Sequence, residues 1–343
     1  MTLYMGVDFH PHQQTVAWCD TRTGETRTLD LLHDVPSVRM FYSTLSEPAV
    51  VGIEASGRAT WFEQLLFETG HELFVGNPVL IRKRATSRHK NDRRDAELIL
   101  ELLLRGEFPA IWRRPAESNR IIDVVGLRHD LVRQRTQLYN RLQAMGHSIG
   151  LPKGRMKSLA VQAMVKAAET DEATAIRRDH LFLLLTQLDV QISDLNKWLE
   201  KKAEADRSVR LLMTQKGVGH LTALVTVHTL GDVSRFRRLT KQVVSFAGLD
   251  PVERSSAGRT RFGSISKAGS ALLRYQLGQA GGIASRSDTR LKSFRKRLGK
   301  KKHKSVVRTA IARKLLVKLA IMLRDEITAD EFDRRGRTVG NAR

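Results

Sequence analysis

The chain begins with an apolar run that carries a single acid, Leu3-Tyr4-Met5-Gly6-Val7-Asp8-Phe9. Its length and composition predict a strand over Leu3–His10. Two further strands are predicted at Gln13–Asp20 and Glu25–His33, with turns marked by Pro and Gly between them. Strands joined by connections this short are expected to pair antiparallel.

The pattern then alternates between helix and strand. Helices are predicted at Val38–Leu45 and Trp61–Glu68, and strands at Val50–Ala55 and Glu72–Gly76. Three antiparallel strands followed by a helix and a further strand match the order of a ribonuclease-H-like α/β domain. Spacing alone does not separate this order from other α/β folds.

Four carboxylates stand out in this region. Asp8 and Glu54 each lie late in an apolar strand, where burial without a partner is costly. Asp92 and Asp95 are three residues apart at the head of a helical pattern, so they share a helix face. Carboxylate oxygens suit Mg²⁺, and paired cations about 4 Å apart catalyse phosphoryl transfer. We therefore expect the four acids to bind Mg²⁺, or Mn²⁺ in its place.

Simpler interpretations exist for single residues. Asp95 could merely favour a helix N-terminus. His10 and His12 follow Asp8 closely and are expected to be loop residues rather than ligands, because a zinc site would need further ligands. Cys19 is expected to be a small apolar strand residue.

The charge of the chain indicates a polyanionic partner. Its 343 residues contain 59 Lys and Arg against 36 Asp and Glu, a formal net charge of +23. Contacts with phosphates release counterions, and a membrane surface also attracts basic proteins. The sequence contains no apolar run long enough to span a bilayer, and no signal peptide opens it. One cysteine excludes an intramolecular disulfide, and we expect a cytoplasmic protein without membrane partners.

Residues from about 96 to 206 have a helical pattern. One seam alternates by four and three, and a looser stripe precedes it, with Pro152-Lys153-Gly154 between them. The seam consists of Leu181, Leu185, Leu188, Ile192, Leu195 and Leu199, and the stripe of Leu127, Leu131, Leu138, Leu142, Met145 and Ile149. An antiparallel hairpin or coiled coil that also dimerises is one interpretation. An ordinary intramolecular helix pair is equally compatible.

The third region is basic and mainly helical. Residues 211–224 fit a helix-hairpin-helix in which Gly217 and Gly219 free the turn and helical N–H groups face a phosphate; the alternative is a plain turn between core helices. Arg254 to Arg324 contains 20 Lys or Arg and one acid, Asp288, yet keeps apolar helical spacing. This pattern predicts a folded basic surface. The expected organisation is 1–105 α/β, 106–206 helical, 207–330 mainly α and basic, and 331–343 a tail.

Several motifs in order along nearly the whole chain resemble one family. Asp8, Glu54 and the stretch from Lys90 to Ala96 are similar to the DEDD-type RuvC-like domain of the insertion-sequence "one-ten" transposases, with their "eleven-eleven" group. The C-terminal half follows that family's transposase domain at Gly217-Val218-Gly219, Phe246-Ala247-Gly248-Leu249-Asp250-Pro251, Ser255-Ser256-Ala257-Gly258, Ile265-Ser266-Lys267-Ala268-Gly269-Ser270 and Leu272-Leu273-Arg274.

The resemblance implies a prokaryotic, nucleoid-associated DNA recombinase guided by a noncoding bridge RNA. That RNA pairs with double-stranded donor and target DNA, and the RuvC-like acids bind magnesium. A serine attacks the DNA phosphate and forms a phosphoserine link. The helical region mediates assembly into a dimer, or a tetramer on DNA, with active sites composite between protomers.

Counting back from Lys267, Ser256 takes the serine position. The family usually has Ser-Gly there, whereas this chain has Ser256-Ala257-Gly258 after Ser255, so the nucleophile could be Ser255. Lys216 replaces a frequent Pro and adds a phosphate-seeking charge. The residues expected to contact nucleic acid are Lys216, Gly217, Gly219, Arg259, Arg261, Lys267, Arg274, Arg295, Lys296, Arg297, Lys300, Lys301 and Lys302.

Two other functions fit part of the sequence. A metal-dependent junction resolvase, in which water attacks, explains the residues up to 95 but leaves the block from Ser255 to Lys267 unexplained. A non-catalytic nucleic-acid-binding protein explains the charge but not four convergent acids.

Overall fold

The computed structural model describes residues 2–56, 59–84, 91–152, 154–253 and 262–338. Contacts divide the chain into two compact units, Met1–Arg113 and Arg114–Arg343. The division into three parts and a tail expected from the sequence stays a prediction. Within the described residues, no helix is both long and apolar enough to cross a membrane.

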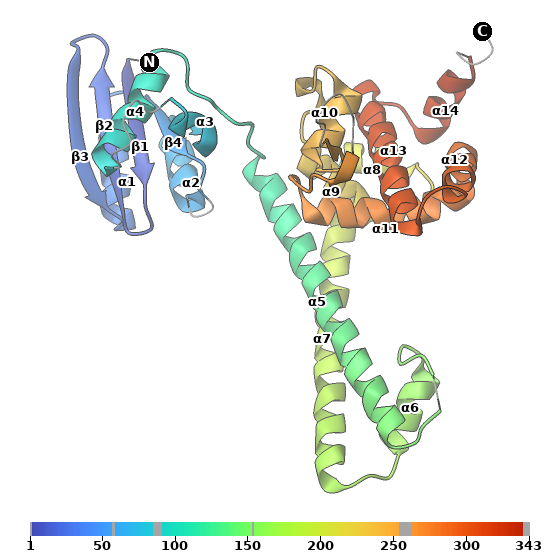
Figure 1. The fold of residues 1–343 in the computed structure, drawn as a ribbon. Coiled ribbons are helices and arrows are strands. Elements are labelled where there is room, and N and C mark those ends of the chain that lie inside the picture. The colour runs from blue at the N-terminus through green and yellow to red at the C-terminus, as the bar shows by residue number, and fades with distance from the viewer. Residues whose placement is uncertain (1, 57–58, 85–90, 153, 254–261, 339–343) are drawn as a thin grey trace. The chain divides into compact units, whose positions relative to one another are not determined.

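The first unit is a mixed α/β domain, as predicted. Its five-stranded sheet has the order β3-β2-β1-β4-β5, with β1–β2 and β2–β3 antiparallel and β1–β4 and β4–β5 parallel (Figure 1). The strands are β1 (Leu3–Phe9), β2 (Gln13–Asp20), β3 (Glu25–Leu32), β4 (Ala49–Glu54) and β5 (Glu72–Gly76), and the helices are α1 (Val35–Ser43), α2 (Thr60–Glu68), α3 (Pro78–Arg82) and α4 (Asp92–Leu104). All five strands and the first two helices lie within a few residues of their predicted bounds.

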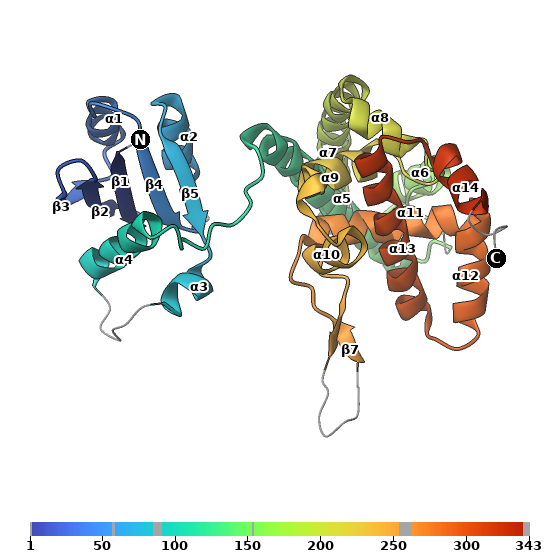
Figure 2. The same cartoon turned by 90° about the horizontal axis from the view of Figure 1, so that it is seen from above.

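Alternate residues of the central strands pack against different layers. Met5 and Val7 of β1 and Val51 and Ile53 of β4 join the core beneath α1 and α2. The even-numbered residues of both strands face α4 instead, where Val50 packs with the helix. Figure 2 shows α1 and α2 on one side of the sheet and α4 on the other. A period of two along the strands therefore separates the core from the side that carries the acids.

Gly6 allows the helix to approach the sheet closely. A Cβ atom at this position would overlap the carbonyl oxygen of Ala96 and the amide nitrogen of Leu100. Both are backbone atoms of α4 and cannot rotate away as a side chain would. Only glycine lets β1 and α4 meet at this distance.

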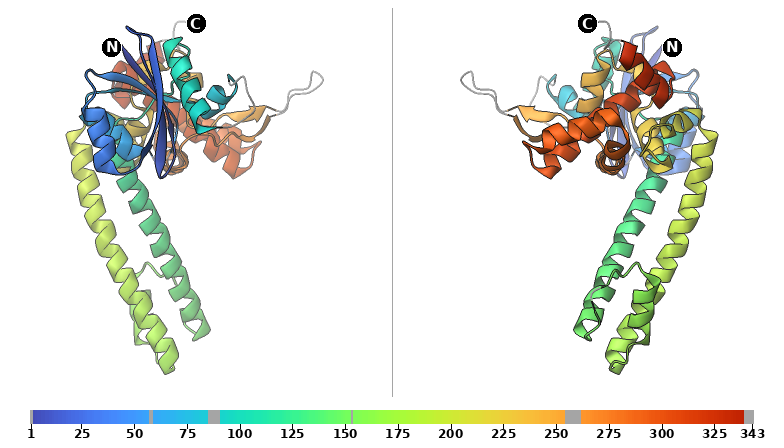
Figure 3. Two further views of the ribbon diagram at one scale, coloured as in Figure 1. Left: turned by 90° about the vertical axis from the view of Figure 1, so that its left-hand side faces the viewer. Right: turned by 90° about the vertical axis from the view of Figure 1, so that its right-hand side faces the viewer.

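The second unit begins with a long helical hairpin, whose helices lie side by side in Figure 3. Its helices are α5 (Ala116–Ser148), α6 (Leu159–Ala167) and α7 (Glu172–Ala205). Three polar pairs link α5 and α7: Glu117 with Lys202 (2.9 Å), Arg128 with Asn196 (2.9 Å) and Arg135 with Asp189 (2.8 Å). Residue numbers rise on one helix as they fall on the other, so the helices are antiparallel.

The predicted apolar seam of α7 is confirmed, because Leu185, Ile192 and Leu199 are buried. Leu127 of the predicted α5 stripe is exposed (52%), so its placement in that stripe was wrong. Ile121 and Val125 are buried at that end of α5 and join the core of the second unit, which changes the buried face of the helix.

The remainder of the second unit is mainly helical, as predicted. It consists of α8 (Arg207–Met213), α9 (His220–Leu230), a 3₁₀ turn (Val233–Arg235), α10 (Leu239–Phe246), the paired strands β6 (Pro251–Glu253) and β7 (Phe262–Ile265), α11 (Ala271–Ser287), α12 (Thr289–Gly299), α13 (Lys304–Asp325) and α14 (Ala329–Thr338). The helix α14 includes most of the segment expected to be a tail.

A buried charge network joins α12, α13 and α14. The Lys318 ammonium lies 3.2 Å from Asp288 Oδ2 and 2.9 Å from Asp333 Oδ1. Asp288 also caps α12 by accepting a hydrogen bond from Leu291 N (3.0 Å). Burial alone would raise the pKa of Asp288, but the Leu291 amide and the Lys318 charge outweigh it and hold that pKa below its usual value.

We predict that Gly6→Ala destabilises the first unit by about 1–3 kcal/mol or more, as overpacking against a rigid neighbour does. Urea unfolding measures the loss. Gly126→Ala is the control, since a Cβ there meets open space within α5; it should stabilise by about 1 kcal/mol. Unchanged stability in Gly6→Ala would contradict the close approach of α4.

Asp288→Asn keeps a capping oxygen but removes the charge. We expect it to destabilise the second unit near pH 7 by about 3 kcal/mol, since Lys318 retains only Asp333. A lowered folded-state pKa contributes stability above the unfolded value of 3.8, and this is lost as the pH falls through the folded-state pKa. The difference between wild type and variant should therefore shrink below about pH 4.

Unfolding curves at several pH values measure this difference. Asp171→Asn is the matched control, because Asp171 caps α7 at an exposed position without a buried lysine. A difference between wild type and Asp288→Asn that does not depend on pH would refute the account.

Candidate metal centre and nucleic-acid interface

Two of the predicted acids lie on the α4 side of the sheet. Val7 pairs with Ile53 in the parallel register of β1 and β4, so Asp8 and Glu54 occupy the next position of their strands. Both belong to the even-numbered set that faces α4. Strand pairing alone therefore brings these acids to the same edge and the same face of the sheet.

The other two acids extend the buried stripe of α4. Ala96, Ile99 and Leu103 pack on the sheet. Asp92 lies one turn before Ala96, and Asp95 one turn before Ile99, so both continue this stripe at the helix N-terminus. Asn91 caps the helix by accepting a hydrogen bond from Arg93 N (3.1 Å). The same packing that buries the apolar residues points the acids toward Asp8.

His10 lies in the loop after β1, as expected, but its imidazole approaches the acids and makes it a candidate ligand. Its Nε2 lies 3.0 Å from Asp8 Oδ2 and 3.5 Å from Asp92 Oδ1. Potential ligand atoms of Asp8, His10 and Asp92 all lie within 4.8 Å of one another, the one such set of three or more acids, histidines or cysteines among the described residues. The available sequence signal was the spacing of two from Asp8, which does not by itself identify a ligand because β1 ends at Phe9.

The electrostatics of the group favour a cation. Burial raises the pKa of Asp8; the nearby His10 lowers it, and the charges of Asp95 and Asp92 raise it again. Asp95 therefore lies near enough to act on Asp8, although it is not in the set of three. A divalent cation would relieve both the desolvation and the repulsion of these carboxylates. Carboxylates with one imidazole are a donor set that such a cation accepts.

Glu54 lies outside the set of three. Its Oε1 is 3.6 Å from Arg82 Nη2, and its side chain is one third exposed. Glu54 thus lies at the end of β4 on the side that faces α4, and among the described residues its ion-pair partner is Arg82.

In the second unit, Asp250 anchors the base of the β6–β7 hairpin. It accepts hydrogen bonds from Ser266 Oγ (2.5 Å), Ser245 Oγ (3.2 Å) and, through its carbonyl, Ser266 N (2.8 Å). These contacts join the two motifs that flank the hairpin, residues 246–251 and residues 265–270, and so explain their spacing. The residues between the strands, including Ser255, Ser256, Arg259 and Arg261, lie outside the described residues.

Two of the expected contact residues, Gly217 and Arg274, make internal contacts, and a third, Lys267, makes one through its backbone while its side chain is exposed. Gly217 has a φ of +91°, and a Cβ there would lie 2.6 Å from Ala284 N of α11. Lys267 also has a positive φ (56°), and its amide donates to Gly248 O (3.1 Å). The Arg274 guanidinium donates to the carbonyls of Ala247 (3.1 Å) and Gly269 (2.5 Å).

Lys216 and Gly219 are exposed at the turn between α8 and α9. The two helices around the turn were predicted; its role as a helix-hairpin-helix that binds nucleic acid stays a prediction.

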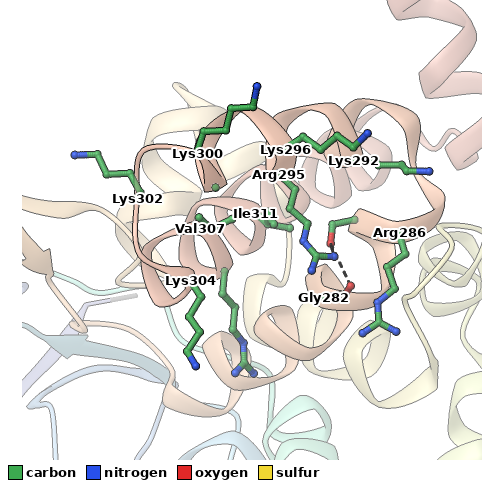
Figure 4. Close-up of a pocket in the computed structure, with 13 residues that line it drawn as sticks. Gly282, Arg286, Lys292, Arg295, Lys296, Lys300, Lys302, Lys304, Val307 and Ile311 are labelled. Carbon is green, nitrogen blue, oxygen red and sulfur yellow. Dashed lines mark hydrogen bonds between the residues drawn. The ribbon is translucent and has the colours of Figure 1, made fainter.

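A basic groove lies among α11, α12 and α13. Eight of its thirteen lining residues are Lys or Arg: Arg286, Lys292, Arg295, Lys296, Lys300, Lys302, Lys304 and Arg308. Arg295 reaches Ser285 Oγ and Arg308 reaches Gly278 O, and neither partner is acidic. Within the described part of the chain, none of the eight forms an ion pair with an acid. Figure 4 shows their side chains around the groove.

The groove contains four of the predicted contact residues, Arg295, Lys296, Lys300 and Lys302. The expected contact residues did not include the other four: Arg286 of α11, Lys292 of α12, and Lys304 and Arg308 of α13. Arg297 points to another face of α12, with its guanidinium carbon 5.8 Å from the Phe294 ring centre, and Lys301 is not among the lining residues.

Comparison with known proteins identifies the family of the chain. The family model described as "Transposase IS116/IS110/IS902 family" matches residues 209–296, and a DEDD-type IS110 model described as "Transposase" matches residues 5–147. A probable family 20 transposase of Pseudomonas aeruginosa is 27% identical over 278 residues, 79% of this chain and 77% of the relative.

Two further relatives are named for insertion sequences. The IS1328 transposase of Yersinia enterocolitica is 26% identical over 78% of this chain and 81% of its own length. The IS1111A transposase of Coxiella burnetii is 28% identical over 66% of this chain and 63% of its own length. The two family models together cover more than half of the chain, and the chain belongs to the IS110 family of insertion-sequence transposases.

Proposed function

We propose that this transposase cleaves and rejoins DNA through a serine nucleophile, with metal held by a RuvC-like first unit and with a bridge RNA as guide. The observation that carries the metal-dependent part is the meeting of Asp8, His10 and Asp92 at one edge of the sheet. The strand order 3-2-1-4-5, antiparallel then parallel, supports the ribonuclease-H-like assignment. The resemblance of the residues around Ser256 supports the serine.

Asp8 and Asp92 are the residues that would hold a Mg²⁺ or Mn²⁺ ion, with Asp95 and Glu54 contributing charge at the same edge. Such an ion would polarise the scissile phosphate and stabilise the charge that develops in the transition state. The packing of α4 on β1 holds the carboxylates in place before substrate binds, so little reorganisation is required.

In the proposed reaction, the serine oxygen forms a bond to phosphorus while one bond from phosphorus to a deoxyribose oxygen breaks. The serine loses its proton, and the departing oxygen gains one. A strand hydroxyl later attacks the phosphoserine and reverses these changes, so the phosphodiester is conserved without an energy source. Ser256 is the proposed nucleophile and Ser255 the alternative.

The basic groove is the proposed path for a nucleic-acid backbone. Eight cations without acidic partners repel one another, and a row of phosphates would relieve that repulsion. Among its thirteen described lining residues, Val307 and Ile311 alone have apolar side chains, and none has an aromatic ring on which bases could stack. It would therefore bind DNA or RNA without reading sequence, which leaves sequence choice to base pairing with the guide.

Asp8→Asn should reduce metal-dependent strand cleavage by roughly 100-fold or more, because the carboxylate contributes several kcal/mol through the metal. DNA binding should be retained. End-labelled DNA, bridge RNA and Mg²⁺ are incubated with the full chain, which is then denatured, and covalent protein–DNA adducts are measured.

Ser256→Ala should abolish the adduct in this assay, with Ser255→Ala as the matched control. Loss of the adduct in Ser255→Ala but not in Ser256→Ala would identify Ser255 as the nucleophile. Cleavage without any adduct would support the resolvase alternative, and binding without cleavage under every metal and RNA condition would support a non-catalytic protein. Normal cleavage by Asp8→Asn would refute the metal site.

Salt dependence tests the groove. If Lys296 and Lys300 each contact a phosphate, the double variant Lys296→Ala, Lys300→Ala should lower the slope of log K against log [salt] by about 2. Affinity should fall similarly for unrelated sequences. Lys201→Ala is the control, since Lys201 is exposed on α7 away from the groove. Duplex DNA and bridge RNA measured separately distinguish the two ligands; an unchanged slope for both would contradict the groove.

A further inference from the structure

The imidazole of His10 is the feature of the metal centre that a site of four carboxylates does not explain. It extends from the end of β1, two residues after Asp8 and on the same face. Its backbone N–H donates to Gln13 O (3.0 Å), which closes the turn into β2. The ring is therefore positioned by the strand and by the turn.

The spacing of the donor atoms suits direct coordination. Two ligands at a right angle on a cation with bonds of about 2.1 Å are about 3.0 Å apart. His10 Nε2 lies 3.0 Å from Asp8 Oδ2 and 3.5 Å from Asp92 Oδ1. His10 Nε2 therefore lies near the separation expected for neighbouring ligands from each of the two oxygens, and all three donor atoms lie within 4.8 Å of one another.

We propose that His10 is a direct nitrogen ligand, so that this centre prefers Mn²⁺ and similar transition-metal ions to Mg²⁺. The inference rests on the metal site proposed above and adds the identity of one ligand and its consequence. Mg²⁺ takes oxygen ligands and keeps much of its water, whereas first-row transition ions accept imidazole readily. One nitrogen ligand among oxygen ligands therefore increases the difference in affinity between Mn²⁺ and Mg²⁺ beyond that of a site made of carboxylates alone.

A different role for His10 would leave a different signature. As a hydrogen-bond donor to Asp8, the ring would orient the carboxylate without touching the ion. Removing it would then weaken all divalent ions similarly. As a ligand, its removal should weaken Mn²⁺ and leave Mg²⁺ nearly unchanged.

The test uses Mn²⁺ itself and the full-length protein. Electron paramagnetic resonance of free Mn²⁺ measures its affinity, and competition measures that of Mg²⁺. His10→Gln should weaken Mn²⁺ binding roughly tenfold or more, since even indirect partners of metal ligands alter affinity by 10–100-fold. The ratio of Mg²⁺ to Mn²⁺ affinity should rise, and His10→Asp should raise the Mg²⁺ preference further. His12→Gln is the matched control from the same turn.

Pulsed resonance of the bound Mn²⁺ reports the ligand without reference to catalysis. A ¹⁴N coupling in the wild type that disappears in His10→Gln supports the proposal. Bound Mn²⁺ without nitrogen coupling would overturn it, as would a parallel loss of both ions. Asp8→Asn separates the two proposals: if it abolishes Mn²⁺ binding while His10→Gln does not alter it, the metal site stands and the histidine ligand fails. If neither substitution alters binding, the metal site fails as well.

Discussion

The backbone contact between β1 and α4 at Gly6 determines where the chemistry of the first unit can occur. With no Cβ at Gly6, the carbonyl of Ala96 and the amide of Leu100 lie against the strand. The N-terminal turn of the helix then lies beside the end of the strand. The apolar stripe of α4 supplies the packing, and its polar continuation, Asp92 and Asp95, supplies charge next to Asp8. Folding energy and site geometry come from the same contact.

The second unit contains charged residues of two kinds, one buried and paired and the other lining the basic groove. Lys318 is buried and is neutralised by Asp288 and Asp333, so its role is structural. Among the residues that the structure describes, the cations around the basic groove have no acidic partners and remain available to phosphates. A Cβ at Gly248 would lie 2.6 Å from the amide nitrogen of Ala268, so glycine at this position lets the two ends of the β6–β7 hairpin lie close together. The second unit therefore contains both buried charges that stabilise the fold and exposed charges that are available to a ligand.

Much of this could be predicted from the sequence, because strands and amphipathic helices have short periods. The bounds of β5 and the antiparallel course of α5 and α7 follow from such patterns. His10 could not be assigned, since a histidine after a strand indicates a ligand only when a helix more than eighty residues later is known to pack beside it. Arg286, Lys304 and Arg308 were missed for the same reason, because they join the groove from α11 and α13. Lys292 lies on α12 with the expected residues, and only the structure shows that it lines the groove.

The roles of several single residues could not be predicted, because they depend on contacts with residues that are distant in the sequence. Arg274 is one of many basic residues in its region, yet its guanidinium satisfies two backbone carbonyls. Leu127 fits a helical stripe, but the core that covers the start of α5 contacts Ile121 and Val125 instead. Glu54 was placed correctly on its strand, while its contact with Arg82 depended on the position of α3.

The central claim is that one edge of the sheet binds a divalent cation between β1 and α4. Anomalous diffraction from crystals of the full chain soaked in Mn²⁺ tests it most directly. The account predicts an anomalous peak within bonding distance of Asp8 and Asp92. A folded first unit with ordered carboxylates and no peak at that edge, at Mn²⁺ concentrations that support DNA cleavage, would contradict it.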